Sequence, residues 1–491
     1  MSVNGTHLEA QMGALLSSVI LPHHALEMPC AGYGRCGKCR VVAHGALSAL
    51  SDAEREHLSP QDISRGVRLA CCARVEGDCT VTLEGAAASQ IRLAGEMPDF
   101  VHDPIFSVCG AAVDIGTTTL ASCLYGPDGT LLAQASAPNP QAGWGADVIS
   151  RIEAALHGSG DALAASVRAG VRALVLEMAA SAHISAEAVD ALVITGNTAM
   201  LYLLTQTDPD CLSHAPFAAS RLFGETLAAG ELGLPCPHAQ VYLPRCMSAF
   251  VGADITTALL ASGICSKPDT RMLVDIGTNG EIALWHRGQL SCCSTAAGPA
   301  FEGPGFMGMA ERRAQWITSA YRTAHCRPTS LGAARRKDLR QGVIDALACL
   351  VELEQLDETG LLEQDPAPVA PPVCLTQKDV RMVQLAKSAI CAGLSTLLRV
   401  EGLCGRTRRL AVAGGFGSYL DVDSAGRIGL LPEELVPRVR VLGNAALSGA
   451  AMLLLNRGFI PRSEALAAGA RTVDLSTSAE FMNAYTEGMF F

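Results

Sequence analysis

Residues 111–120 read A-A-V-D-I-G-T-T-T-L, and residues 272–281 repeat the central motif as M-L-V-D-I-G-T-N-G-E. In both copies the order of apolar and polar residues predicts a strand, a tight glycine turn and a second strand. A carboxylate at a strand end, followed by glycine and hydroxyl residues, suits a phosphate chain with bound Mg²⁺, because backbone N–H groups can approach the phosphate oxygens. Two copies predict a duplicated nucleotide-binding fold with the phosphates between its halves.

The repeated motif supplies the candidate catalytic carboxylates. We expect Asp114 and Asp275 to anchor the metal or its waters. Glu281 follows the second turn and is expected to orient a water or the metal. The alternative for Glu281 is a solvated carboxylate at the edge of a strand.

Two further turns lie where ligands of α/β sheets collect, at the ends of predicted strands. The apolar run Ala191–Thr195 ends at Gly196 and Asn197, and we expect these two residues to contact the nucleotide. The run Leu410–Ala413 leads into Gly414, Gly415 and Gly417. A glycine turn of this kind lets the backbone lie against an adenine or a ribose.

Four of the nineteen cysteines stand apart from the others. Cys30, Cys36 and Cys39 lie on a glycine-rich loop, C-A-G-Y-G-R-C-G-K-C, and Cys71 follows in G-V-R-L-A-C-C. Three close thiolates and one distant thiolate predict a 2Fe–2S cluster. A structural zinc site is the alternative, although zinc ribbons normally pair two Cys-x-x-Cys motifs and this region has one.

The neighbouring residue Cys72 makes the choice of the fourth ligand a separate question. Adjacent side chains of an extended segment point in opposite directions, so we expect only one of Cys71 and Cys72 to face the cluster. We assign Cys71, because it completes R-L-A-C, which resembles the ferredoxin pattern.

The residues around the cysteines predict a β-grasp ferredoxin of about 85 residues. Arg40–Ala43 is expected to be a strand, Ser51 and Glu54 form a capping box that opens a short helix, and Thr80–Leu83 alternates as a strand. Residues 87–107 lose this periodicity and are expected to link the cluster domain to the next domain.

Composition narrows the classes of function. The chain has 491 residues, a net charge of −11 and 17% charged residues, so it has ample apolar material for large cores and no basic stripe for nucleic acid. We expect no membrane span, because two of the most apolar stretches are shorter than the roughly 20 residues required. Without a signal-peptide pattern, nineteen cysteines favour a reducing, cytoplasmic location.

The two phosphate-type turns and the glycine turn resemble the superfamily of actin, sugar kinases and heat-shock ATPases. This resemblance implies an α/β fold of two RNase-H-like, actin-like ATPase halves that bind ATP and Mg²⁺. It matches the first phosphate motif to Asp114, Gly116, Thr117 and Thr118. It matches the second motif to Asp275, Gly277, Thr278 and Asn279, and the adenosine motif to Gly414, Gly415 and Gly417.

Together with the N-terminal cysteine loop, these motifs resemble the reductive activators of corrinoid proteins. Further phrases agree with that family, among them Gly145–Ile152, Phe250–Asp254 and Gly443–Leu447. The resemblance implies one-electron reduction of an inactive Co(II) corrinoid to Co(I), coupled to ATP. The expected partners are a corrinoid protein of a methyltransferase system and a low-potential electron donor, and a homodimer is a candidate assembly.

Three other functions compete with this expectation. A small-molecule kinase with a fused redox domain would need a catalytic base, for which Asp254 and Glu302 are candidates. An activator of a 2-hydroxyacyl-CoA dehydratase would carry a 4Fe–4S cluster shared across a dimer, unlike the four cysteines here. A heat-shock-type peptide-binding ATPase would need a β-rich domain after the glycine turn.

The expected domains are therefore a 2Fe–2S ferredoxin domain, a linker, a first ATPase half, and the rest of the ATPase fold with the second phosphate motif and the adenosine motif. Their expected limits are residues 1–86, 87–107, 108–190 and 191–491. The stretch Asn139–Arg151 is either part of the partner interface or a loop that orders the phosphate site.

Overall fold

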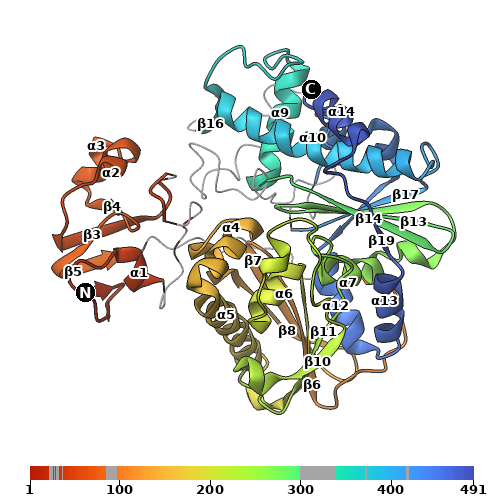
Figure 1. Ribbon diagram of the computed structural model, residues 1–491, viewed down its shortest axis with the longest axis horizontal. Helices are drawn as coiled ribbons and strands as arrows, with labels where there is room; N and C mark the ends of the chain where they lie inside the picture. The colour runs from red at the N-terminus through yellow and green to blue at the C-terminus, as the bar shows by residue number, and fades with distance from the viewer. Residues whose placement is uncertain are drawn as a thin grey trace.

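The computed structural model describes residues 1–21, 26, 28, 32–35, 37–83, 95, 97–298, 339–370, 373–415 and 420–491. Three of the predicted ligand-binding residues, Cys30, Cys36 and Gly417, lie outside these ranges, as does Glu302. Most of the described strands belong to three sheets, and Figure 1 shows the N-terminal sheet with its helices to one side of the other two. No helix in the described ranges is both long enough and apolar enough to cross a membrane.

The N-terminal unit is a five-stranded mixed sheet in the order β2-β1-β5-β3-β4. Strand β1 runs parallel to β5, whereas β3 is antiparallel to both β5 and β4. The predicted capping box is confirmed, because the Ser51 side chain accepts from Glu54 N and the Glu54 side chain accepts from Ser51 N. The elements are β1 (Ser2–Val3), β2 (Thr6–His7), α1 (Leu16–Ile20), β3 (Arg40–Leu47), α2 (Asp52–His57), α3 (Pro60–Ser64), β4 (Val67–Leu69) and β5 (Val75–Thr82).

The second sheet has the order β10-β11-β9-β6-β7-β8 and carries the first Asp-Ile-Gly-Thr motif between β6 and β7. Leu163, Val167 and Val171 of α5 are buried in the core of this half, as the helical spacing predicts. The strands are β6 (Cys109–Ile115), β7 (Thr119–Tyr125), β8 (Leu131–Pro138), β9 (Val189–Gly196), β10 (Glu225–Ala228) and β11 (Gln240–Leu243). The helices are α4 (Val148–Ala154), α5 (Gly160–Ser181), α6 (Thr198–Thr205) and α7 (Ala253–Ser262).

The third sheet has the order β18-β17-β12-β13-β14-β19 and carries the second motif between β12 and β13. Thr376 caps the long helix α10 in a capping box with Asp379, as predicted. The strands are β12 (Arg271–Ile276), β13 (Gly280–His286), β14 (Gln289–Thr295), β17 (Arg409–Ala413), β18 (Val439–Gly443) and β19 (Arg471–Thr472). The helices are α9 (Leu339–Glu352), α10 (Gln377–Val400), α11 (Val422–Arg427), α12 (Ala445–Leu455), α13 (Phe459–Ala468) and α14 (Ala479–Glu487), and a separate hairpin joins β15 (Ala367–Ala370) to β16 (Val373–Leu375).

The second and third sheets repeat one topology, which confirms the predicted duplication. In each sheet the motif-bearing strand lies between an antiparallel hairpin partner, β7 or β13, and a parallel strand, β9 or β17. A further parallel strand, β11 or β18, then extends the sheet.

Helices α7 and α12 form the interface between the two halves (Figure 1). One hydrophobic core contains residues of both helices together with residues of both sheets, such as Ala112 and Leu273. The helices cross closely, because a Cβ atom at Gly449 would collide with the Thr257 carbonyl oxygen. The two motif-bearing sheets are therefore held against each other through this helix pair.

Two observations concern the connections between units. The limit expected between residues 190 and 191 falls inside β9, which pairs with β6 and so belongs to the first half. The N-terminal unit touches that half where Leu21 packs against Gly143, which has no space for a Cβ atom.

Candidate functional site

A cavity between the two halves is lined by both Asp-Ile-Gly-Thr turns. The predicted residues that line it are Asp114, Gly116, Thr117, Thr118, Asn197, Asp275, Gly277, Thr278, Asn279, Glu281, Gly414 and Gly415. Asp254 and Asn444 also line the cavity, although neither was among the expected nucleotide-site residues. Gly196 does not line it; the close approach of Ile115 O, 2.7 Å from the position of a Cβ atom, explains the glycine at the end of β9.

The first turn is held in place by polar side chains from two other segments. Gly116 N donates to Thr119 O at 3.0 Å and closes the turn. Asn139 Nδ2 donates to Gly116 O at 2.8 Å, and Arg151 Nη2 donates to Thr117 O at 2.6 Å. Asn139 and Arg151 are buried, so these bonds are shielded from water. The stretch Asn139–Arg151 therefore orders the phosphate turn, which was one of its two expected roles.

Two asparagines extend this arrangement toward the cavity. Asn197 caps α6 by accepting from Met200 N, and its Nδ2 donates to Thr117 Oγ1 at 3.2 Å. Asn444 caps α12 by accepting from Leu447 N, and its Nδ2 donates to Asp114 Oδ2 at 2.9 Å. Asn444 thus connects the second half to the first carboxylate.

The second turn meets the glycine-rich turn that follows β17. Gly277 N donates to Asn279 O at 3.0 Å. Gly414 has a φ of +97°, and a Cβ atom there would lie 2.5 Å from Asp275 Oδ1 and from Ile276 O. Only glycine fits this conformation and this close approach. The buried hydroxyl of Thr278 has no hydrogen-bond partner among the described residues, which suits a ligand in the cavity.

Four carboxylates gather around the cavity, and burial raises the pKa of each. The pKa of Asp114 rises to about 6, with Asn444 partly offsetting the rise. Burial and then neighbouring carboxylates raise the pKa of Asp254 to about 7 and that of Asp275 to about 8. The pKa of Glu281 is also raised well above its usual range, by burial first and then by Asp254 and Asp275. A bound cation would relieve this repulsion.

Glu281 lies opposite Asp275 in the ladder of β12 and β13. It is buried on a strand that is paired on both sides, so the alternative of a solvated carboxylate at a strand edge is wrong. Within the described ranges, no three His, Cys, Asp or Glu side chains form a group that could hold a metal ion directly. Mg²⁺ usually keeps several waters and binds through one or two protein carboxylates together with the phosphates of a substrate. The lining of this cavity has the carboxylates that such a site needs.

The sequence interpretation named Asp254 only as a candidate base of the alternative kinase, and it missed Asn444 and the individual contacts of Arg151. Asp254 lies in the first turn of α7, and Asn444 precedes α12. One signal was present for Asn444, because Gly443-Asn444 repeats the strand–Gly–Asn–helix pattern of Gly196-Asn197. Asp254 ends the phrase Phe250–Asp254, which resembles the family, but its neighbours in the cavity come from other elements.

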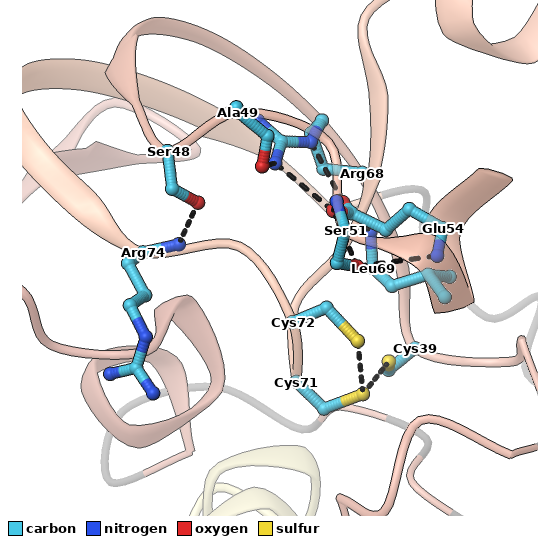
Figure 2. A network of polar contacts seen from close by, with 10 residues as sticks. All are labelled: Cys39, Ser48, Ala49, Ser51, Glu54, Arg68, Leu69, Cys71, Cys72 and Arg74. Carbon is cyan, nitrogen blue, oxygen red and sulfur yellow. Dashed lines mark hydrogen bonds and ion pairs between the residues drawn. The ribbon is translucent and has the colours of Figure 1, made fainter.

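A second site lies in the N-terminal unit, where three cysteine sulfurs meet (Figure 2). Cys39 Sγ lies 3.2 Å from Cys71 Sγ, and Cys71 Sγ lies 3.6 Å from Cys72 Sγ. Neither distance is that of a disulfide bond, whose sulfurs lie about 2.0 Å apart. The premise that Cys71 and Cys72 lie on an extended segment is wrong, because Cys72 N and Ala73 N both donate to Leu69 O and form a turn.

A buried ion pair supports that turn. The Glu54 carboxylate accepts from Arg68 Nε at 2.7 Å and from Leu69 N at 3.1 Å. Its other oxygen accepts from Ser51 N and from Arg68 Nη2. These bonds lower the pKa of Glu54 against the opposing effect of burial, so the carboxylate stays ionised. Figure 2 shows this network, which joins Ser51 and Glu54 at the start of α2 to Arg68 and Leu69 of β4, just before the two cysteines.

Two family descriptions match this chain. Residues 109–267 match the RACo middle region, and residues 269–491 match the C-terminal domain of RACo, the ASKHA domain.

Two curated proteins are similar in sequence. The chain is 31% identical over 456 residues to the corrinoid activation enzyme RamQ of Eubacterium limosum, covering 83% of this chain and 75% of that protein. It is 24% identical over 312 residues to the [Co(II) methylated amine-specific corrinoid protein] reductase of Methanosarcina barkeri, covering 55% of this chain and 56% of that protein.

A solved structure, that of a reductive activator for corrinoid, iron-sulfur protein, has a similar fold. Its TM-score is 0.70 at 23% identity, over 95% of this chain and 93% of that chain. The predicted α/β fold with actin-like ATPase halves is thereby confirmed.

Proposed function

This chain belongs to the family of reductive activators of corrinoid proteins, and from that premise we propose that it couples ATP to the one-electron reduction of Co(II) to Co(I) in a corrinoid protein. The observation that carries the proposal is that Asp114 and Asp275 line one cavity in a chain that also brings Cys39 and Cys71 together.

The cavity residues fit a magnesium nucleotide. Within the part of the chain that the structure describes, the Thr278 hydroxyl has no hydrogen-bond partner, and Gly414 lets the backbone approach Asp275. We assign the metal and its waters to Asp114 and Asp275, and a water-orienting role to Glu281. The turns at Gly116–Thr118 and Gly277–Asn279 are assigned to the phosphates. Asn197 and Gly196 are assigned to the ordering of the first turn, and Gly414, Gly415 and Gly417 to the adenosine.

The N-terminal unit fits a 2Fe–2S cluster. Cys39 and Cys71 are 32 residues apart in sequence, yet their sulfurs lie 3.2 Å apart, which is close but too far for a bond between these two sulfurs. Gly32, Gly34 and Gly37 of the loop have positive φ, as expected where backbone N–H groups turn toward an anionic group. We assign Cys30, Cys36, Cys39 and Cys71 as the ligands. A cluster bound there would supply a one-electron donor with a potential near −400 mV.

The requirement for ATP follows from the potentials. Co(I) is a much stronger reductant than such a donor, so the electron moves uphill. Each 30 mV of that gap costs about 0.7 kcal/mol for one electron. A nucleotide bound between the halves can meet this cost by changing the docking or the ligation of the corrinoid partner. The external electron donor must then have a low potential as well.

A small-molecule kinase is the second candidate, because Asp254 places a possible base in the same cavity. The raised pKa of Asp254, about 7, suits proton transfer near neutral pH. Transfer of labelled phosphate to a small molecule in a substrate screen would favour this function.

Anaerobic spectroscopy tests the proposal directly. The reduced protein is mixed with a Co(II) corrinoid protein, and the Co(I) absorption band is followed with ATP, with a non-hydrolysable analogue and without nucleotide. We expect the band to grow only with ATP. A band that grows equally without nucleotide, or never grows despite an intact cluster, would contradict the proposal.

A further inference from the structure

We propose that Cys72 is an alternative fourth ligand of the cluster. Its sulfur can bind the cluster iron in place of the Cys71 sulfur. This inference rests on the proposed cluster site and adds a thiol that the four-cysteine assignment leaves out. Either Cys71 or Cys72 completes the ligand set, and only one of their two sulfurs is bound to the iron at a time.

The turn places both sulfurs on the same side of the chain. Because Cys72 N donates to Leu69 O at 2.8 Å and Ala73 N donates to the same oxygen at 2.9 Å, residues 69–73 curl rather than extend. The two sulfurs lie 3.6 Å apart, close to the 3.2 Å between Cys71 and Cys39. Rotation of a cysteine between staggered rotamers moves its sulfur by roughly 3 Å, which is comparable with this separation.

The glycine loop covers both cysteines. A Cβ atom at Gly32 would lie 4.0 Å from Cys71 Cβ, and one at Gly34 would lie 3.4 Å from Cys72 Sγ. Gly32 and Gly34 lie between the assigned ligands Cys30 and Cys36 in sequence. The loop that holds half of the ligand set therefore passes as close to Cys72 as to Cys71.

The surroundings let either cysteine serve without moving the backbone. Leu69 N is fixed by the buried Glu54 carboxylate, which is also paired with Arg68, so the base of the turn is rigid (Figure 2). Cys71 is 6% exposed, whereas Cys72 is half-buried and has room to turn. When the Cys72 sulfur takes the place of the Cys71 sulfur, the Cys72 thiol would lose a proton, and the Cys71 thiolate would leave the iron and take up a proton, so no electron changes hands.

Alanine variants of the full chain test the proposal, because alanine cannot bind iron. After anaerobic reconstitution, iron and sulfide per chain are measured with the visible spectrum and the electron paramagnetic resonance spectrum of the reduced protein. We expect Cys71→Ala to keep at least half of the wild-type iron, with shifted g values. Cys72→Ala should keep all of it, and the double variant should keep less than a tenth.

Cys79→Ala is the matched control, because Cys79 is a buried thiol on β5 of the same unit and belongs to its hydrophobic core. It should leave the iron content and the g values unchanged. If Cys71→Ala loses as much iron as the double variant does, the proposal is wrong.

A second pair of variants covers the case in which Cys71→Ala does not fold. Cys71→Ser keeps the size of the side chain, and Cys71→Ser/Cys72→Ala removes the second thiol from that background. We expect the single variant to hold at least three times more iron than the pair. Equal iron contents would contradict the inference. A wild-type protein without iron would instead refute the proposed cluster itself, so the two failures are distinguishable.

Discussion

The two Asp-Ile-Gly-Thr turns have the same four residues but different surroundings. In the first half, Asn139 and Arg151 donate to the carbonyl groups of the turn, and Asn444 donates to Asp114. In the second half, no described residue donates a hydrogen bond to the Asp275 side chain or pairs with the Thr278 hydroxyl.

This difference in hydrogen bonding affects the carboxylates of the two turns differently. The first turn is preorganised by the protein, and the pKa of its carboxylate rises only to about 6. The second turn holds a carboxylate whose pKa rises to about 8, because burial and two nearby carboxylates oppose its charge. If the cavity holds a magnesium nucleotide as proposed, the second turn therefore gains more stabilisation from the bound cation than the first turn does.

The largest expected effect is that of Asp275→Asn. We expect ATP-dependent Co(I) formation to fall by roughly 100-fold or more, since a catalytic metal stabilises developing charge by several kcal/mol. The nucleotide-free variant should nevertheless melt at a higher temperature than wild type, because one source of carboxylate repulsion is gone. Asp208→Asn, a change at an exposed site, is the control and should alter neither quantity. A variant with normal ATP dependence would contradict the role of the second turn.

Arg151→Ala tests the bracing of the first turn. The variant loses the bonds from Arg151 to Thr117 O and to Gly145 O, and we expect about 3 kcal/mol of destabilisation from these charged hydrogen bonds. Nucleotide affinity, measured by calorimetry, should fall by about 10- to 100-fold. The control is Arg172→Ala on α5, whose side chain is exposed and bonds only to Gly233 O among the described residues. Unchanged affinity in a folded Arg151→Ala would show that the brace is not needed.

Thr278→Val tests the unpaired hydroxyl of the second turn. Removing a buried hydroxyl without a partner should leave the free energy of unfolding unchanged or slightly raised, while nucleotide affinity falls by about 10-fold. Thr396→Val on α10 removes another buried, unpartnered hydroxyl and is the matched control. It should share the stability change without the loss of affinity. Equal affinities in the two variants would argue against a phosphate at Thr278.

The smallest expected effect is that of Asn444→Ser. Serine retains an acceptor for the cap of α12 but cannot reach Asp114 as a donor. Losing one hydrogen bond of about 1 kcal/mol should weaken nucleotide binding by about 5-fold. A titration of affinity against pH should also show the Asp114 pKa above its wild-type value of about 6. An unchanged pKa would mean that Asn444 does not tune the first carboxylate.

The sequence was sufficient for the parts of the fold that depend on local pattern. The repeated motif predicted two matching sheets, and the capping residues Ser51 and Thr376 predicted where two helices begin. The lining of the cavity by both motifs followed from the same duplication. Each of these features is encoded within a short stretch of chain.

Other parts of the site arise from packing between distant elements. Asp254 and Asn444 reach the cavity because α7 and α12 cross closely at Gly449, which no single stretch encodes. Arg151 is a fully buried cation that donates to the carbonyl groups of Gly145 and of Thr117, and Thr117 lies 34 residues away in sequence, so no local pattern indicates this role. The expectation that Cys71 and Cys72 lie on an extended segment was wrong, because the chain turns at Leu69 rather than continuing as a strand.

Proton release on nucleotide binding tests the central claim, that both turns serve one magnesium nucleotide. Aspartate in an unfolded chain ionises near pH 4, whereas Asp254 and Asp275 have pKa values of about 7 and 8. At pH 7 the empty site therefore retains protons, which a bound cation should expel.

Calorimetry at pH 7 with Mg²⁺ and a non-hydrolysable ATP analogue, repeated in two buffers of different ionisation enthalpy, measures both the stoichiometry and this release. We predict one nucleotide per chain with release of roughly one proton. Two nucleotides per chain, or binding without proton release, would contradict the account.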